Sequence, residues 1–383
     1  MIKFSELNKE DKTAVVLFNL GGPDKLSSVQ KFLFNLFNDK AIINLPQPFR
    51  FLIATLISTL RNKKSQNIYR QIDNKSPLLE ITTKQASLIE AELNNHGKFK
   101  VFVAMRYWHP FSKEIMEKVN QYQPNKIILL PLYPQFSTTT SESSINDFYQ
   151  EFKKYKNKLN AKIKAVCCYP LQPEFIEAHS QLIKQAIDKN LESKTNEISQ
   201  FRFLFSAHGL PQDIIDKGDP YSFQAQKTTE AIIDSLAKKL NINIGELDYQ
   251  LCYQSKVGPK KWTSPSLDSE IKRAIYDKKI PVIIPVSFVS DHSETLVELD
   301  IDYKNKAKEL GATDYIRVES LNFNQFFIAS LTKICLATDF SSTKKCFSFN
   351  SAIDLENIKN NCSARICPSH FTKCPNFDLK IND

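Results

Sequence analysis

The chain has 383 residues, of which 42% are hydrophobic and 24% are charged, and its formal net charge at pH 7 is +9. This composition is typical of a globular protein with two or three domains. Because the basic residues occur singly or in short groups and match no nucleic-acid motif, the charge indicates a mildly basic surface and argues against nucleic-acid binding.

The N-terminal segment MIKFSELNKEDKT has no apolar core of the kind that signal peptides carry, so we expect a cytoplasmic protein. The longest apolar run, 49–60, has about 12 residues, whereas a membrane-spanning helix needs about 20. Arg61, Lys63 and Lys64 follow it at once. The run therefore fits either a buried core helix or an apolar segment with a basic edge, lying peripherally at the inner face of a membrane.

Strands and helices alternate along the chain. Apolar, β-branched runs predict strands at 14–20, 99–105, 126–131, 163–168, 201–205, 249–252 and 282–289. Helical spacing predicts helices at 29–37, 174–189, 221–240 and 268–278. Strands separated by helices of this length favour parallel sheets with right-handed crossovers, and their two groups predict two α/β domains with a site between them.

Only eight glycines occur in the chain, so each is expected where the backbone requires one. Gly21 and Gly22 follow the first predicted strand in the segment NLGGP, which lacks both the G-x-G-x-x-G spacing and the Walker lysine of nucleotide sites. We therefore expect a tight turn from strand to helix, at which another group approaches the backbone.

The stretch 281–303, PVIIPVSFVSDHSETLVELDIDY, combines a predicted strand that ends near Ser290, a loop, and a helix capped by Ser290 or Asp291. Ligand sites in open α/β sheets form beyond the carboxyl ends of the strands. Asp291, His292 and Glu294 follow this strand directly, and they are therefore candidate site residues.

Glu294, Glu298 and Asp302 are spaced four residues apart, which puts them on one face of the predicted helix. Like charges at this spacing repel by roughly 0.2–0.5 kcal/mol per pair when exposed. The stripe is either a solvated helix face or the wall of a site that holds a cation. Its start at a strand end favours the site.

His208 follows the predicted strand at 201–205 in the segment FSAHGLP. A lone histidine in a loop is usually structural, but this one ends a strand at the same expected sheet edge as His292 and Glu294. Because imidazole binds metals and accepts protons near neutral pH, the three side chains form a candidate metal site or general base. Ser206 is no nucleophile candidate, since the chain lacks a G-x-S-x-G motif there.

Six segments, in chain order, resemble those of the ferrochelatase family: 19–23 (NLGGP), 104–108 (AMRYW), 133–137 (YPQFS), 205–211 (FSAHGLP), 252–259 (CYQSKVGP) with Trp262, and 288–296 (FVSDHSETL). The resemblance implies a chelatase-type fold with two Rossmann-like domains, each a parallel sheet flanked by helices. It also implies an enzyme that inserts ferrous iron, a substrate, into protoporphyrin IX with release of two protons, the terminal step of haem biosynthesis, and that requires no cofactor.

The resemblance also implies roles for individual residues. His208 and Glu294 bind the iron, and His208 accepts pyrrole protons. A path for protons or metal is formed by Asp291, His292, Glu298 and Asp302. The porphyrin contacts Leu20, Arg106, Tyr107, Trp262 and Phe288, with Arg106 as a partner for a propionate or for the acidic site. The alternatives are a related chelatase acting on coproporphyrin III or another metal, and a tetrapyrrole or metal carrier without turnover.

By the same resemblance the first domain covers 1–135, with an apolar lip over the porphyrin at about 45–64 and a membrane-contacting segment at Phe49–Lys64. The second domain covers 136–318 and carries His208 and Glu294. A helix at 319–336 packs back on the first domain, and 337–383 is a cysteine-containing extension. The chain has Asn74-Lys75 where many family members have Gly-Gly, which puts the local turn in question.

Eight cysteines in a chain without an export signal indicate reduced thiols or metal ligands rather than a disulfide framework. Some ferrochelatases hold a [2Fe–2S] cluster. The resemblance makes Cys362, Cys367 and Cys374 its candidate ligands here, with Cys346, Cys167 or Cys168 as the fourth. The tail spacing departs from those relatives, and Thr138 stands where the animal type has its earlier cysteine. A tail with reduced thiols is the alternative.

Overall fold

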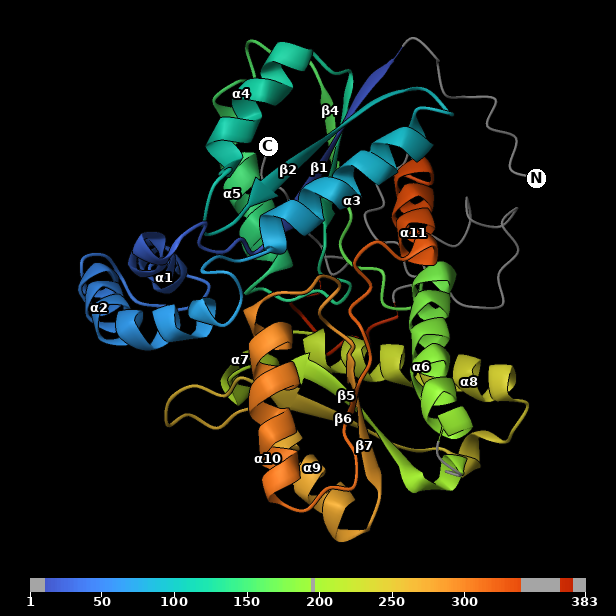
Figure 1. The fold of residues 1–383 in the computed structure, drawn as a ribbon. Helices are drawn as coiled ribbons and strands as arrows, with labels where there is room; N and C mark the ends of the chain where they lie inside the picture. Colours follow the sequence, from blue (N-terminus) through green and yellow to red (C-terminus); the bar gives the residue numbers. More distant parts are fainter. Residues whose placement is uncertain (1–10, 194–196, 339–365, 375–383) are drawn as a thin grey trace. The chain divides into compact units, whose positions relative to one another are not determined.

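Two parallel β-sheets, each of four strands, organise the chain (Figure 1). The structure, a computed structural model, describes residues 11–193, 197–338 and 366–374. Of these, 11–168 and 331–338 belong to one unit, and the described residues of 169–330 and 366–374 belong to a second. The first unit extends beyond residue 135 because β4 (Lys162–Ala165) pairs with β3 (Lys126–Pro131).

The first sheet has the strand order β2-β1-β3-β4, and all its pairs are parallel. The central strand β1 (Lys12–Asn19) pairs with β2 (Lys98–Met105) on one side and with β3 on the other. Residues 14–18 of β1 are all buried. A strand covered on both faces needs apolar side chains in both directions, which explains the uninterrupted run AVVLF.

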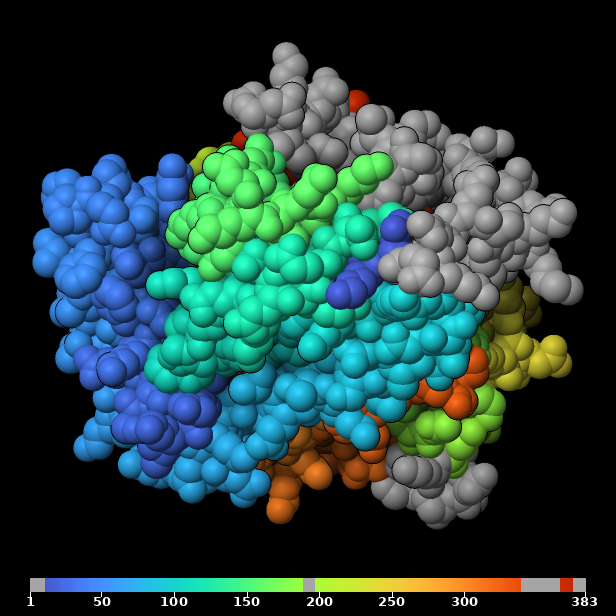
Figure 2. Space-filling model, turned by 90° about the horizontal axis from the view of Figure 1, so that it is seen from above, coloured from blue at the N-terminus to red at the C-terminus, as the bar shows by residue number. Residues whose placement is uncertain are grey.

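The helices of the first unit are η1 (Leu26–Ser28), α1 (Val29–Phe37), α2 (Phe49–Arg70), α3 (Leu78–Leu93), α4 (Ser112–Tyr122) and α5 (Ser141–Lys153). Side chains of α4 and α5, among them Ile115 and Phe148, share one core cluster with Val16 of β1. Helix α3 packs against β2 and β1. Helices α1 and α2 pack together and project from one side of this unit (Figures 1 and 2).

The second sheet has the order β6-β5-β7-β8, again entirely parallel. Its strands are β5 (Phe201–His208), β6 (Asp248–Gln254), β7 (Ile280–Pro285) and β8 (Ile316–Arg317). The predicted α/β class with two parallel sheets is therefore confirmed.

The helices of the second sheet's unit are α6 (Pro173–Ser193), η2 (Ile198–Gln200), α7 (Gln212–Asp216), α8 (Tyr221–Leu240), η3 (Ile244–Glu246), α9 (Leu267–Tyr276), η4 (Glu294–Tyr303), α10 (Lys304–Glu309) and the first half of α11 (Gln325–Leu336). Leu267 of α9, Leu299 of η4 and Ala307 of α10 form one core cluster with Leu204 and Ile283 of the sheet. This packing fixes η4 against the strands that carry the candidate site.

Two predicted strands are too long. The strand predicted at 163–168 ends at Ala165, and the one predicted at 282–289 ends at Pro285. After Pro285 the chain turns, and the Phe288 amide donates to the Pro285 carbonyl over 3.3 Å. Apolar residues beyond the turn stay buried, so their burial, and not a sheet ladder, accounts for the apolar pattern.

The turn after β1 matches its prediction. A Cβ atom on Gly22 would lie 2.4 Å from the Cβ of Ser76, so only glycine fits this close approach. The segment that brings Ser76 there has Asp73 and Asn74 at φ values of 57° and 61°. Aspartate and asparagine tolerate this left-handed region, which explains how the turn forms without the Gly-Gly pair.

Candidate active site

The carboxyl ends of three neighbouring strands of the second sheet lie side by side, and most of the predicted site residues are at or just beyond these ends. His208 is the last residue of β5, and it pairs with Gln254, the last residue of β6. On the other side, Ser206 pairs with Pro285, the last residue of β7, from which the chain continues to Glu294. Parallel strands thus bring His208, His292 and Glu294 together, as the strand-end argument predicts.

His208 is oriented by its own backbone neighbour. Its Nδ1 lies 2.6 Å from the carbonyl oxygen of Gly209, and because a carbonyl only accepts, Nδ1 carries the proton. In the neutral ring this tautomer leaves the Nε2 lone pair free. Nε2 lies 3.6 Å from Oε1 of Glu294, and both side chains are about one-third exposed, at 36% and 31%. The pair is therefore accessible to a small ion or ligand.

His292 lies on the other side of Glu294. Its Nδ1 donates to the Ser290 carbonyl over 3.0 Å, and its Nε2 is 3.3 Å from Oε2 of Glu294. Burial by itself lowers the pKa of His292, but the hydrogen bond and negative charge of Glu294 outweigh it, so the pKa is raised. Glu294 is thus bracketed by two imidazoles, and the Phe288 ring lies 6.5 Å from that of His208 and 4.9 Å from that of His292.

Glu298 is held by donors from the end of β6. Its carboxylate accepts from the Ser255 amide over 3.1 Å, from the Ser255 hydroxyl over 2.5 Å and from Gln254 Nε2 over 3.0 Å. Gln254 Nε2 also donates to the Glu294 carbonyl over 3.0 Å. Burial and the charge of Glu294 raise the pKa of Glu298, and these donors oppose the rise.

Gln254 and Ser255 are the site residues that the sequence does not reveal. They belong to the segment CYQSKVGP. Glutamine and serine side chains seldom serve as metal ligands or general bases, so no role follows from their chemistry. Their place just after the predicted strand at 249–252 is the signal that points to them, because that strand neighbours the one ending near His208.

Glu294 and Glu298 belong to a π-helix, η4, and not to an ordinary α-helix. In a π-helix the backbone bonds join residues five apart, and such turns occur often at functional sites. The predicted cap is wrong, since Ser293 occupies the N-cap and no side chain caps the helix. Asp302, the third carboxylate of the stripe, is exposed.

Asp291 is enclosed by protein donors. Its carboxylate accepts from Thr295 Oγ1 over 2.9 Å, Ser320 Oγ over 2.8 Å, Asn322 Nδ2 over 2.7 Å and Arg317 Nη1 over 3.2 Å. Burial raises its pKa, but the charge of Arg317 and these hydrogen bonds prevail, and the pKa is lowered. The carboxylate is thus ionised and saturated with donors.

Trp262 packs beside the loop that follows His208. A Cβ atom on Gly209 would lie 3.1 Å from Cε3 of Trp262 and 3.0 Å from the Gln254 carbonyl oxygen. The Gly209 amide donates to that carbonyl over 2.9 Å. Trp262 and Phe288 are therefore both next to His208 and half-buried.

The predicted porphyrin residues Leu20, Arg106 and Tyr107 lie in the first unit. Arg106 pairs with Asp39 through Nη2 over 2.9 Å, and Tyr107 donates its hydroxyl to the same carboxylate over 2.9 Å. Ser143 donates to it over 2.5 Å. The Tyr107 ring is buried at 1% exposure and packs in a cluster that Leu20 borders. Asp39 and Ser143 are further polar residues without a sequence signal.

Helix α2 exposes large apolar residues and buries small ones. Phe49, Leu52, Leu56 and Leu60 are 62%, 62%, 59% and 72% exposed, whereas Ala54 and Ser58 are buried. The buried-core alternative for this run is therefore wrong. Among the residues that the structure describes, no helix is long and apolar enough to cross a membrane.

Two of the candidate cluster cysteines lie in the described tail segment of the second unit. Cys367 and Cys374 are buried, and Gln224 Nε2 donates to Cys367 Sγ over 3.2 Å. Cys167 and Cys168, which belong to the first unit, are also buried. Cys346 and Cys362 lie outside the described residues. Within the described ranges there is no group of three or more His, Cys, Asp or Glu side chains suited to a metal ion.

Comparison with known proteins places this geometry in context. The family model described as Ferrochelatase matches residues 12–338. A ferrochelatase of Rickettsia felis is 47% identical over 368 residues, covering 95% of this chain and 97% of the relative. A ferrochelatase of a Wolbachia subspecies of Drosophila simulans is 48% identical over 327 residues, covering 85% and 99%. Among solved structures, SirB from Bacillus subtilis with Fe3+ is 10% identical, with a TM-score of 0.47 over 84% of this chain and 93% of that chain.

The lowered pKa of Asp291 predicts how stability depends on pH. A carboxyl whose folded pKa lies below its ordinary 3.8 stabilises the protein above that pH, and this contribution is lost as the pH falls through the folded value. We expect Asp291→Asn to lower the unfolding free energy by about 3 kcal/mol at pH 6, because it removes one partner of a buried ion pair. Denaturant unfolding at pH 6 and pH 3 should show a smaller gap between variant and wild type at pH 3. A gap independent of pH would contradict the assignment.

Proposed function

The chain belongs to the ferrochelatase family, and on this premise we propose that it inserts ferrous iron into protoporphyrin IX, with release of two protons, to form protohaem. The observation that carries the proposal is the His208–Glu294 pair, which presents the ring nitrogen Nε2 and a carboxylate oxygen 3.6 Å apart beyond the carboxyl end of β5. The reaction is the terminal step of haem biosynthesis, and iron and porphyrin are both substrates.

The separation of the pair suits one divalent ion. Ligand distances of roughly 2.1 Å, as in zinc sites, let a single ion touch both Nε2 of His208 and Oε1 of Glu294 without moving either residue far. Imidazole and carboxylate are also ligand types that ferrous iron accepts. Glu298 adds negative charge next to this position, which favours the approach of a cation.

Proton release is the second requirement of the reaction. A free-base porphyrin carries two pyrrole N–H groups, and both protons leave as the metal enters. His208 Nε2 is the proposed first acceptor once the iron has passed from it to the porphyrin nitrogens, because the Gly209 carbonyl holds the ring proton on Nδ1 and Nε2 then has the only free lone pair of the ring. Glu294, His292, Glu298 and the exposed Asp302 then offer successive acceptors toward solvent. Asp291, being saturated with donors, contributes to this path by holding the loop.

The porphyrin itself requires flat apolar surfaces. We assign Phe288 and Trp262 as contacts near the metal, since both lie beside His208. In the first unit Leu20, Arg106 and Tyr107 are the proposed contacts. Arg106 remains 20% exposed for a propionate, while the buried Tyr107 donates its hydroxyl to Asp39, the ion-pair partner of Arg106.

His208→Ala is expected to lower iron insertion by about 100- to 10,000-fold, the contribution typical of a general base, while porphyrin binding persists. Insertion is followed anaerobically by absorbance, and binding by quenching of protein fluorescence. His109→Ala is the control, because His109 is exposed on the first unit, where its Nδ1 lies 2.8 Å from Glu114. Turnover of His208→Ala at the wild-type rate would refute its assignment as the base.

We propose a cytoplasmic enzyme whose helix α2 rests on the inner face of a membrane. The exposed apolar residues of α2 recur every three or four positions and so share one helix face: Phe49, Leu52, Leu56 and Leu60. Lys63 and Lys64 follow Leu60 within the same helix. A membrane surface would cover this apolar face and also concentrate a hydrophobic porphyrin.

The double variant Leu52→Glu/Leu56→Glu tests this contact. It should reduce binding to vesicles of anionic phospholipid at least about tenfold, because it replaces two exposed apolar side chains by charges that the lipid repels. Co-sedimentation with vesicles measures the bound fraction. Tyr276→Glu, on an 87% exposed residue of the other unit, should bind as the wild type does. Equal binding by all three proteins would refute the membrane contact.

We propose that Cys362, Cys367 and Cys374 supply three thiolates to a [2Fe–2S] cluster. The burial of Cys367 and Cys374 supports this, because thiolates of such clusters lie out of solvent. The proposed insertion uses no group of the cluster.

Protein purified without oxygen should show visible absorbance with about two irons and two sulfides per chain, and Cys374→Ser should lose both. A colourless protein in which every cysteine reacts with a thiol reagent after unfolding would favour the reduced tail.

A further inference from the structure

Arg317 joins two segments that flank the candidate iron ligands. From β8 its Nε donates to Asp300 Oδ1 over 2.6 Å, and its Nη2 donates to Asp300 Oδ2 over 2.5 Å. Its Nη1 donates to Asp291 Oδ1 over 3.2 Å. Asp300 lies within η4, and Asp291 lies in the loop before it. The planar guanidinium therefore bridges the two carboxylates, in a bidentate geometry that lysine cannot reproduce.

The two aspartates enclose the iron-binding stretch in sequence. Asp291 precedes Glu294 by three residues, and Asp300 follows Glu298 by two. The chain after β8 strengthens the first of these anchors, because Ser320 and Asn322 donate to Asp291, and the Asp291 amide donates to Asn322 Oδ1 over 2.9 Å. Both ends of the Glu294–Glu298 turn are thus tied to the chain at and after β8.

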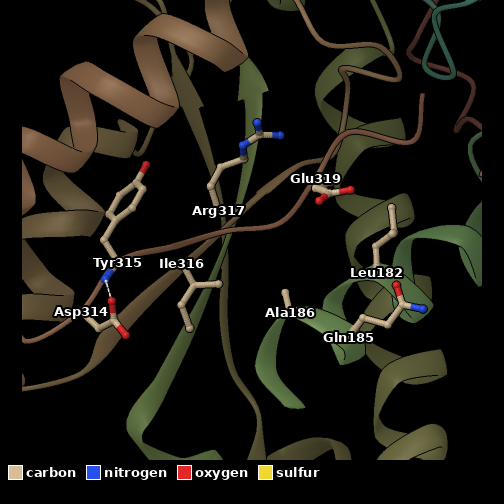
Figure 3. Close-up of a pocket in the computed structure, with 8 residues that line it drawn as sticks. All are labelled: Leu182, Gln185, Ala186, Asp314, Tyr315, Ile316, Arg317 and Glu319. Carbon is tan, nitrogen blue, oxygen red and sulfur yellow. Dashed lines mark hydrogen bonds between the residues drawn. The ribbon is translucent and has the colours of Figure 1, made fainter. Parts of the chain in front are cut away.

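Arg317 also lines a cavity of about 450 Å³ together with Leu182, Gln185, Ala186, Tyr315 and Glu319 (Figure 3). Figure 3 shows its side chain extending away from Gln185 and Ala186. Three of its donor nitrogens are engaged by Asp291 and Asp300, and the side chain is only 12% exposed. The hydrogen bonds of the guanidinium are therefore made to the segments beside Glu294 and Glu298 and are not directed into the cavity.

We infer that Arg317 is a positioning residue for the iron-binding carboxylates, an inference that rests on the proposed function. Glu294 and Glu298 repel each other within a π-helical turn, which by itself is a rare and weakly stabilised backbone. Clamping Asp291 and Asp300 keeps this turn closed. Glu294 then stays 3.6 Å from His208, and Glu298 stays within reach of Ser255 and Gln254.

Arg202 provides a matched control for the loss of a buried arginine. It also bridges two aspartates, with Nε donating to Asp248 over 2.8 Å and Nη1 donating to Asp277 over 2.8 Å. Its side chain is 6% exposed. However, Arg202 lies near the amino end of β5, the end opposite to His208. Removing it should destabilise the protein without touching η4.

The test compares Arg317→Met with Arg202→Met in anaerobic insertion assays, with the thermal midpoint of each measured beside it. We expect Arg317→Met to raise the KM for ferrous iron about tenfold or more, as loss of a residue that orients metal ligands does, with little change in the KM for porphyrin. Arg202→Met should lower the thermal midpoint comparably and leave the KM for iron unchanged. Asp300→Asn, a milder change at a partly exposed residue, should move the KM for iron in the same direction.

Four results would contradict the positioning role or the proposed function. An equal rise of the iron KM in both arginine variants, or a joint rise of both KM values in Arg317→Met, would overturn the positioning role. If Arg317→Met does not fold, an unchanged iron KM in Asp300→Asn would overturn it as well. Wild-type protein that inserts no iron would refute the proposed function instead, and this outcome is distinguishable because the wild type is assayed first.

Discussion

The repulsion between Glu294 and Glu298 is the interaction on which the site depends. Two carboxylates within one turn, both half-buried, cost free energy unless donors or cations face them. The protein supplies part of this compensation through His292, Gln254 and Ser255. The pKa of Glu298 is nevertheless raised, so the compensation is incomplete. A divalent cation would complete it, and this is a physical reason for the proposal that iron binds at this point.

The parallel sheet brings these side chains together at the ends of its strands. Strands β5, β6 and β7 end together, so His208, Gln254 and the loop to Glu294 meet without long connections. Backbone groups just beyond the strand ends orient the side chains. The Gly209 carbonyl accepts from Nδ1 of His208, and the Ser255 amide donates to Glu298. Around them, the Arg317 clamp and the core contacts of Leu299 fix η4 to the sheet. Strand ends and η4 thus position His208, Glu294 and Glu298 relative to one another.

Much of this could be predicted from sequence, for identifiable reasons. The run AVVLF and the segment FRFLFSAH mark central strands because both faces are buried, and His208 is predicted at a sheet edge because that strand ends there. The π-helix could not be predicted, since the four-residue spacing of Glu294, Glu298 and Asp302 fits an α-helix equally well. The roles of Gln254, Asp39 and Arg317 depend on partners that lie between 17 and 104 residues away in sequence, and no local pattern encodes them. Asp291 is a similar case, because its saturation by Ser320 and Asn322 appears only when β8 is in place.

Anaerobic insertion assays of the wild type and of Glu294→Gln show whether this carboxylate binds the iron. Protoporphyrin IX loses its fluorescence when iron enters, so the rate is read without a coupled reaction. We expect insertion by the wild type and at least about a hundredfold loss in Glu294→Gln, which keeps the shape of the side chain but removes the charge that draws the cation. Insertion by Glu294→Gln at the wild-type rate would contradict the claim that this carboxylate binds the iron, and porphyrin binding by the wild type without insertion would identify a carrier.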